Sequence, residues 1–116
     1  MSAIDLDDFR QAVYQMVQYI PYGRATSYGA IARAVGYPNM SRLVGRMLGQ
    51  VSDSDLDIPA HRVVNSQGYL SGKDAFTTPT LMQELLESEG IRVEKNKIKN
   101  WKEVFWNPME ELTVDS

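Results

Sequence analysis

Hydrophobic residues recur at helical spacing near the start of the chain. From about Leu6 to Tyr19 the apolar positions fall three or four residues apart, the repeat of a helix with one face in a core. The sequence Pro21-Tyr22-Gly23 then interrupts the repeat, as expected where a helix has ended. The pattern predicts a first helix whose apolar face consists of Phe9, Val13, Met16, Val17 and Ile20.

Two shorter apolar repeats follow. Thr26 or Ser27 offers the hydroxyl side chain preferred just before a helix, which is expected from Tyr28 to Val35. Residues 36–39 (Gly-Tyr-Pro-Asn) are typical of a turn, and a third helix is expected from about Met40 to Gly49. Two short helices joined by a glycine-containing turn indicate a helix-turn-helix motif. The positions expected to face the core are Ile31, Ala32, Val35, Leu43, Val44, Met47 and Leu48.

The pattern after the third helix is mixed. Val51 to Leu56 is a polar, acidic connection. The strand-like Arg62-Val63-Val64, the turn residues 65–68 and Tyr69-Leu70 together predict a short β-hairpin. Residues 71–78 are expected to form a loop.

A fourth helix is expected to begin at Pro79, with Thr78 as its cap, and to stop at Gly90. Ile91-Arg92-Val93 predicts an edge strand, and the aromatic residues between 100 and 108 are expected to pack onto the core. The inward positions of the fourth helix are Leu81, Met82, Leu85 and Leu86.

These elements predict a mainly α (α+β) fold. At 116 residues the chain has the size of one domain, so we expect a single winged helix-turn-helix-like domain with a short β-hairpin. Its ordered core should span about residues 6–108, and the tail 109–116 is expected to be disordered.

Composition narrows the function classes. The chain is 43% hydrophobic and 23% charged, as globular domains are. It has no cysteine and one histidine, which excludes disulfides and thiolate chemistry, and no metal or other cofactor is expected. Residues 1–8 do not resemble a signal peptide and no apolar run has the length of a membrane span, so we expect a cytoplasmic protein, associated with the nucleoid when bound to DNA.

Charge is distributed unevenly along the chain. The net charge is -3, yet residues 9–52 contain five arginines and no acidic residue, while residues 53–116 contain seven basic and twelve acidic residues. An acid-free, arginine-only stretch is a candidate phosphate-binding surface, although chance unevenness in a small protein is the alternative. The five arginines are Arg10, Arg24, Arg33, Arg42 and Arg46.

The polar face of the third helix carries two of these arginines together with small residues. Glycine in a helix lowers its stability, which close approach of the backbone to a DNA groove would explain. Close packing of two helices is the alternative explanation. The residues of this face are Ser41, Arg42, Gly45, Arg46 and Gly49.

Five sequence blocks, in this order, resemble the C-terminal DNA-binding domain of the O6-alkylguanine-DNA alkyltransferases. The blocks are Ile20-Pro21-Tyr22-Gly23-Arg24, Thr26-Ser27-Tyr28-Gly29-Ala30-Ile31-Ala32, Ser41-Arg42-Leu43-Val44-Gly45, Ile58-Pro59 with His61-Arg62-Val63-Val64, and Leu85 to Gly90 with Glu89. In that family the residue after the proline is the cysteine that accepts the alkyl group, and here it is Ala60. Without the cysteine, and with Trp106-Asn107-Pro108 near its end, the chain resembles the alkyltransferase-like proteins.

The resemblance implies roles for the helix-turn-helix residues. Arg42 matches an arginine that enters the base stack from the minor groove and fills the gap left by an extruded base. Tyr28 matches a tyrosine that crowds the phosphate of the target nucleotide and promotes its rotation. An ordinary phosphate contact for Arg42 and a half-buried core position for Tyr28 are the alternatives. The DNA-binding set implied is Tyr28, Ser41, Arg42, Gly45 and Arg46.

The resemblance also implies a lesion pocket without a catalyst. His61 and Glu89 match members of the relay that would activate the cysteine, and with Ala60 beside them we expect them to hold the pocket in shape. Backbone groups at Ala60 and Val63 match those that read the guanine edge, and Ser71 and Lys73 match the loop that covers the pocket. The pocket set implied is Tyr28, Ala60, Val63, Ser71 and Lys73.

The resemblance implies non-enzymatic binding of O6-alkylguanine in double-stranded DNA by base flipping, which marks the lesion for nucleotide excision repair. The expected partners are this DNA and nucleotide excision repair proteins, and the protein is expected to be a monomer. Two alternatives stay open: a helix-turn-helix regulator that reads intact sequence, and an atypical hydrolytic enzyme in which His61 and Glu89 act on a water molecule.

Overall fold

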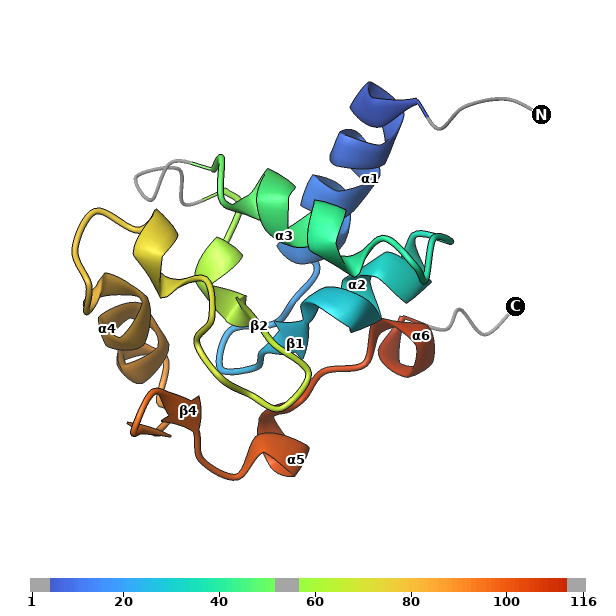
Figure 1. Ribbon diagram of the computed structural model, residues 1–116. Coiled ribbons are helices and arrows are strands. Elements are labelled where there is room, and N and C mark those ends of the chain that lie inside the picture. Colours follow the sequence, from blue (N-terminus) through green and yellow to red (C-terminus); the bar gives the residue numbers. More distant parts are fainter. Residues whose placement is uncertain (1–4, 52–56, 113–116) are drawn as a thin grey trace.

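The computed structural model describes residues 5–51 and 57–112, and most of the described elements are helical (Figure 1). The acidic connection predicted at 51–56 lies, apart from Val51, outside the described residues. The helices are α1 (Leu6–Gln18), α2 (Tyr28–Ala34), α3 (Ser41–Leu48), α4 (Leu81–Ser88), α5 (Trp101–Val104) and α6 (Pro108–Glu111), with 3-10 turns η1 (Ala60–Arg62) and η2 (Lys73–Ala75). The strands are β1 (Thr26–Ser27), β2 (Val63–Val64), β3 (Val93–Glu94) and β4 (Lys97–Ile98).

Helix α1 confirms the first predicted helix. Its N-terminus is capped by Asp5, whose carboxylate accepts the backbone N–H groups of Asp7 and Asp8 at 3.0 and 3.2 Å. The predicted apolar face is buried at Phe9, Val13 and Val17. This face packs on the helix-turn-helix and forms the larger of two core clusters with it.

Helices α2 and α3 form the predicted helix-turn-helix. Ser27 is the cap, since its hydroxyl accepts the N–H of Ala30 at 3.1 Å, while Thr26 is buried in β1. Gly36 turns the chain at a φ of +93°, a backbone conformation that glycine adopts readily. The side chains that α2 and α3 bury are Ala30, Ile31, Ala32, Val44, Met47 and Leu48.

The hairpin predicted at 62–70 is wrong in its pairing. Val63 and Val64 pair in parallel with Thr26 and Ser27, and Tyr69 bridges instead to Lys97. Both valines are fully buried, so the strand has no solvent face and fits between other segments. The hairpin of this fold is β3–β4, in which Val93 pairs with Ile98, so the edge strand predicted at 91–93 lies partly in it.

Helix α4 begins at Leu81, later than the predicted start at Pro79. Thr78 is not its cap: the residue before the helix is Thr80, whose hydroxyl donates to the Glu84 carboxylate at 2.6 Å. The helix ends as predicted, and Gly90 has a φ of +87°. Helix α4 packs with β2 and the hairpin in the second core cluster: Ala25, Val64, Leu70, Met82, Leu86, Ile91 and Ile98.

The C-terminal segment returns to the helix-turn-helix. Trp106 is buried, and its backbone N–H donates to the Ala25 carbonyl at 2.7 Å. Arg24 donates to the carbonyls of Val104 and Phe105 at 2.9 and 2.6 Å and pairs with Glu111 at 3.0 Å.

The predicted disorder of residues 109–116 is therefore wrong for the part that the structure describes. This part begins with helix α6, capped by Asn107, and the ion pair with Arg24 fastens it. Residues 113–116 lie outside the described residues. None of the helices within 5–51 and 57–112 combines the length and the apolar character needed to cross a membrane.

Gly68, in the turn between β2 and Tyr69, is expected to contribute to stability through its backbone conformation and its close contact with Trp101. Gly68 has a φ of +90°, and a Cβ there would lie 3.1 Å from two ring atoms of Trp101. Gly36 has the same backbone conformation with open space around it. Gly36→Ala should lower the free energy of unfolding by about 1–2 kcal/mol from backbone strain alone. Gly68→Ala should lower it by about 1–3 kcal/mol more, because Trp101 must move.

Urea denaturation of the two variants and the parent measures this difference. Equal losses for the two variants would show that the contact between Gly68 and Trp101 contributes nothing.

Candidate nucleic-acid interface and lesion pocket

Helix α3 presents an exposed basic face. Arg42 and Arg46 are exposed and Ser41 is half-buried at the start of the helix, and Arg33 of α2 is also exposed. No carboxylate within residues 5–51 and 57–112 pairs with these three arginines. Such unneutralised cations are what a phosphate backbone requires.

The other two arginines of the acid-free stretch have different roles. Arg10 pairs with Asp7 at 3.2 Å on α1, and Arg24 holds the C-terminal segment. The candidate phosphate-binding surface is therefore smaller than the charge pattern predicted.

Gly45 of α3 faces the ring of Tyr28. A Cβ at Gly45 would lie 3.6 Å from Cδ1 of that ring, which is ordinary van der Waals contact. Gly49 is exposed at the end of the helix, and a Cβ there would meet backbone oxygens of Gly45 and Arg46. At Gly45 the close-packing explanation thus has a definite partner, an aromatic side chain at the start of α2.

A small cavity lies between α3, η1, η2 and α4. Its volume is about 60 Å³, well below the roughly 300 Å³ at which small-molecule pockets begin. It brings together two predicted pocket residues, Tyr28 and Ala60. The full lining is Tyr28, Gly45, Leu48, Gly49, Ala60, Gly72, Ala75, Phe76 and Met82.

The loop after Leu70 closes the cavity against Tyr28. A Cβ on Gly72 would lie only 2.5 Å from the Tyr28 hydroxyl, so glycine permits this contact. Burial raises the pKa of Tyr28, and a hydrogen bond with the Ser71 side chain partly offsets that rise. Tyr28 is therefore a neutral phenol at pH 7, held by the loop that lies over it.

Three predicted pocket residues do not line the cavity in this conformation. Ser71 is exposed and contacts Tyr28, Lys73 is half-exposed at the start of η2, and Val63 is fully buried in β2. The backbone N–H of Val63 donates to the Ala60 carbonyl, and that of Ala60 donates to Ile58 at 2.7 Å. Both amides are thus already bonded within the chain.

Glu89 is the centre of a buried polar network. Its side chain is 5% exposed and accepts from Nε2 of His61 at 2.6 Å, from Nε of Arg62 at 3.0 Å to each oxygen, and from the N–H of Gly23 at 2.9 Å. Arg62 also donates to the Ile20 carbonyl at 2.8 Å. The network joins the end of α4, η1 and the turn after α1.

The environment fixes the protonation states of this network. Burial alone would raise the pKa of Glu89, but hydrogen bonds from Arg62, Gly23 and His61 outweigh it and hold the pKa below its usual value. Burial lowers the pKa of His61 more than Glu89 raises it. At pH 7 a neutral imidazole therefore donates its Nε2 proton to an ionised carboxylate, which can only accept.

Arg62 and Gly23 belong to the network around Glu89, and sequence reasoning did not single them out. Arg62 binds the Glu89 carboxylate, and its guanidinium carbon lies 5.8 Å from the centroid of the Tyr22 ring. The Tyr22 hydroxyl in turn donates to the backbone carbonyl of Ser88 at 2.9 Å. Both belong to blocks already noted, since Arg62 follows His61 directly and Gly23 lies in the Pro-Tyr-Gly-Arg sequence. A buried carboxylate needs a cation, which is the signal that could have found Arg62.

Comparison with known proteins identifies the family to which this chain is similar. The family model of the 6-O-methylguanine DNA methyltransferase, DNA binding domain, matches residues 8–91. Alkyltransferase-like protein 1 of Schizosaccharomyces pombe is 35% identical over 107 residues, covering 89% of this chain and 98% of the relative. A DNA base-flipping protein of Vibrio parahaemolyticus is 33% identical over 105 residues, covering 89% of this chain and 100% of the relative.

Comparison with solved structures gives the same relationship as comparison of sequences. The Schizosaccharomyces pombe protein in complex with damaged DNA containing O6-carboxymethylguanine matches with a TM-score of 0.79 at 34% identity, over 90% of this chain and all of that one. Methylated-DNA–protein-cysteine methyltransferases match over less of their length; that of Mycobacterium leprae is 40% identical over 74 residues, 60% of this chain and 44% of the relative. The chain therefore belongs to the 6-O-methylguanine DNA methyltransferase DNA-binding domain family, in its alkyltransferase-like branch.

Proposed function

We propose that this chain binds O6-alkylguanine in duplex DNA, turns the modified base out of the helix and leaves its alkyl group in place. The observation that carries the proposal is the position of Ala60. It lies beside the intact network of His61, Arg62 and Glu89 and lines a cavity with Tyr28, directly behind the basic helix α3. The frame of an alkyl-accepting site is present, and a methyl group stands at its reacting position.

Arg42 would occupy the space left by the extruded base. The side chain is exposed, has no carboxylate partner in the described part of the chain, and projects from the helix that carries Arg46. A planar guanidinium can stack between bases and donate to the unpaired cytosine at once. Ser41, Gly45 and Arg46 would accompany it along the DNA backbone.

Tyr28 would act at the mouth of the pocket. Its ring lies between Gly45 and the cavity, and its hydroxyl lies against Gly72. Because about 60 Å³ is too small for a base, entry requires the loop with Ser71, Gly72 and Lys73 to move away from Tyr28. Extrusion of a base costs a few kcal/mol, least where damage has weakened its pair, so this step favours alkylated guanine.

The alternatives find less support. A hydrolytic enzyme would need His61 free to activate water, but its Nε2 is bonded to Glu89 and neither residue is among those lining the cavity. Direct reading of intact sequence would require several side chains on α3 that can reach base edges, and this face offers two glycines and Ser41 between its arginines.

In the proposed role, the bound protein recruits repair proteins to the lesion. Because the alkyl group stays on the DNA in this proposal, its removal must come from a second repair system, such as nucleotide excision repair. We propose such repair proteins as partners, with this protein acting as a monomer at the DNA, in the cytoplasm on the nucleoid. A single chain supplies Tyr28, Arg42 and Ala60, which supports the monomer.

Arg42→Ala tests the DNA-binding face. Affinity for a duplex with one O6-methylguanine should fall about tenfold to a hundredfold, since a stacked and hydrogen-bonded cation is lost, while unfolding in urea stays unchanged. Arg10→Ala removes an arginine of the same acid-free stretch that lies on α1, and it should leave affinity nearly unchanged. Fluorescence anisotropy of labelled duplexes measures both. Parental affinity in Arg42→Ala would contradict the assignment.

Ala60 should set the size of adduct that the pocket accepts. The parent should bind O6-benzylguanine and O6-methylguanine duplexes with similar affinity, because the methyl side chain leaves room beside the adduct. Ala60→Leu should weaken binding of the benzyl adduct by about tenfold more than that of the methyl adduct, through steric overlap. Much weaker binding of every larger adduct by the parent would refute this use of Ala60.

The network around Glu89 predicts a pH dependence of stability. The pKa of His61 is lowered in the folded chain, so the unfolded chain binds its proton first as pH falls through about 6.5, and stability is lost. The pKa of Glu89 is also lowered, which adds a further loss below about pH 4.5.

His61 is the one histidine of the chain, so the change between about pH 6.5 and 5 reports it alone. The free energy of unfolding should decrease over that window in the parent and stay level in His61→Phe. An increase on acidification would mean that His61 is charged in the folded protein.

A further inference from the structure

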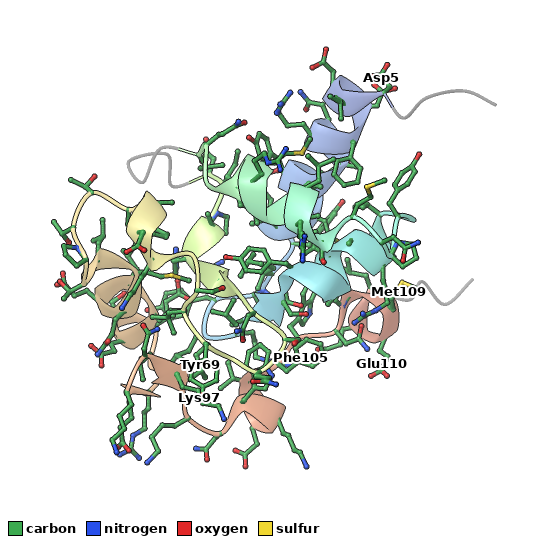
Figure 2. The ribbon with its side chains drawn as sticks, viewed as in Figure 1. Asp5, Tyr69, Lys97, Phe105, Met109 and Glu110 are labelled. Carbon is green, nitrogen blue, oxygen red and sulfur yellow. The ribbon has the colours of Figure 1, made fainter. Side chains whose placement is uncertain are left out.

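A second basic surface lies on the hairpin, apart from the helix-turn-helix. Five of the seven basic residues after position 52 fall within residues 92–102, where Glu94 is the one acidic residue. All five are exposed. Figures 1 and 2 show the hairpin, with β4 and Lys97 labelled, at the lower left of the view below α4, while α3 lies in the upper half. The hairpin surface consists of Arg92, Lys95, Lys97, Lys99 and Lys102.

The turn of this hairpin has an unusual composition. Lys95 and Asn96 have φ values of +52° and +66°, two successive left-handed residues of the kind that favour Asn-Gly in tight hairpins. Lysine in this conformation lowers stability, and such positions are concentrated at functional sites. Lys97 is held over the Tyr69 ring at 5.3 Å, and Lys99 pairs with Glu94 at 3.4 Å. The charges are thus displayed on an ordered frame.

Two grooves flank the hairpin. One of about 320 Å³ follows residues 90–94 and the other, of about 270 Å³, follows residues 97–101; Glu94 and Lys99 line both. In the part of the chain that the structure describes, β3 pairs with β4 alone, so its outer edge lies open along the first groove. An open strand edge can accept an added strand from another chain.

The details favour a protein segment over nucleic acid. The open edge of β3 offers backbone hydrogen bonds that an extended protein segment can complete and a nucleic acid cannot. The aromatic rings of this surface already make contacts within the protein: Trp101 packs against Gly68 and Phe105, and the Lys97 ammonium lies over the Tyr69 ring. Binding of single strands relies on free rings on which bases stack, so this surface lacks a main element of such a site.

We propose that the hairpin surface binds an extended acidic segment of a partner protein, which adds as a strand along β3 and pairs its carboxylates with the lysines. Because this surface lies on elements other than α2 and α3, the partner can bind while DNA occupies the helix-turn-helix. The proposal goes beyond lesion binding and does not depend on it, although it supplies the surface that recruitment of repair proteins would need.

The first experiment uses a synthetic peptide as the probe. A labelled peptide of about eight residues, alternating glutamate with valine, has the length and period of a strand. It is titrated onto the full chain, free and saturated with an O6-methylguanine duplex. We expect binding in both cases, with amide NMR shifts confined to residues 90–99. A matched peptide with glutamine for glutamate should bind at least about tenfold more weakly.

Two triple variants separate the surfaces. Lys95→Gln/Lys97→Gln/Lys99→Gln should weaken peptide binding at least about tenfold and leave duplex affinity unchanged. Arg33→Gln/Arg42→Gln/Arg46→Gln should do the reverse.

Three results would overturn the proposal: equal binding of the two peptides, shifts centred on α3, or loss of duplex affinity in the lysine variant, which would make the hairpin a DNA contact. Lack of lesion selectivity with intact peptide binding would refute the proposed function alone.

Discussion

The carboxylate of Glu89 joins three segments that are far apart in the sequence. It receives His61 and Arg62 from the turn that carries Ala60, and the Gly23 amide from the turn after α1. Removing the Arg62 guanidinium would leave this buried charge without its ionic partner and cost about 3–5 kcal/mol, a large part of the stability of a small domain. Glu89 therefore ties the turn that carries Ala60 to the end of α4 and to the turn that precedes β1.

A pocket held in this way does not depend on a reacting atom. The network orients Ala60 through backbone and neighbouring side chains, and none of its hydrogen bonds uses the side chain at position 60. Tyr28 and Gly45 shape the opposite wall through packing. The geometry of the cavity therefore does not depend on the side chain at position 60, since the network and the packing around Tyr28 hold it.

Local patterns predicted the helices better than the pairings. Helices α1 to α3 followed from apolar spacing and from caps such as Ser27, because those signals lie within a few residues. Each of these strands has only two residues, and the interior in which they are buried determines which strands pair. The residues around Val63 and Val64 therefore do not indicate that the partner strand is Thr26–Ser27. Gly23 and Glu89 are 66 residues apart, so no local pattern indicates their contact, and the family resemblance identified Glu89 with His61 but not with Arg62 or Gly23. The helical turn after Pro108 depends on Arg24, another distant partner.

The net charge of the chain does not describe the surface that would contact DNA. The total of -3 would repel a duplex, yet none of the acidic residues lies within residues 9–52; they fall near the start of α1, in the connection that follows α3, and at intervals from Asp74 to the end of the sequence. On the α2–α3 face, Arg33, Arg42 and Arg46 are exposed and pair with no carboxylate of the described residues. Repulsion from the acidic elements and attraction to this face act together on an approaching polyanion, so the charge distribution orients the encounter. The basic hairpin packs beside helix α4, which carries Glu84 and Glu87, and lies on other elements than the α2–α3 face.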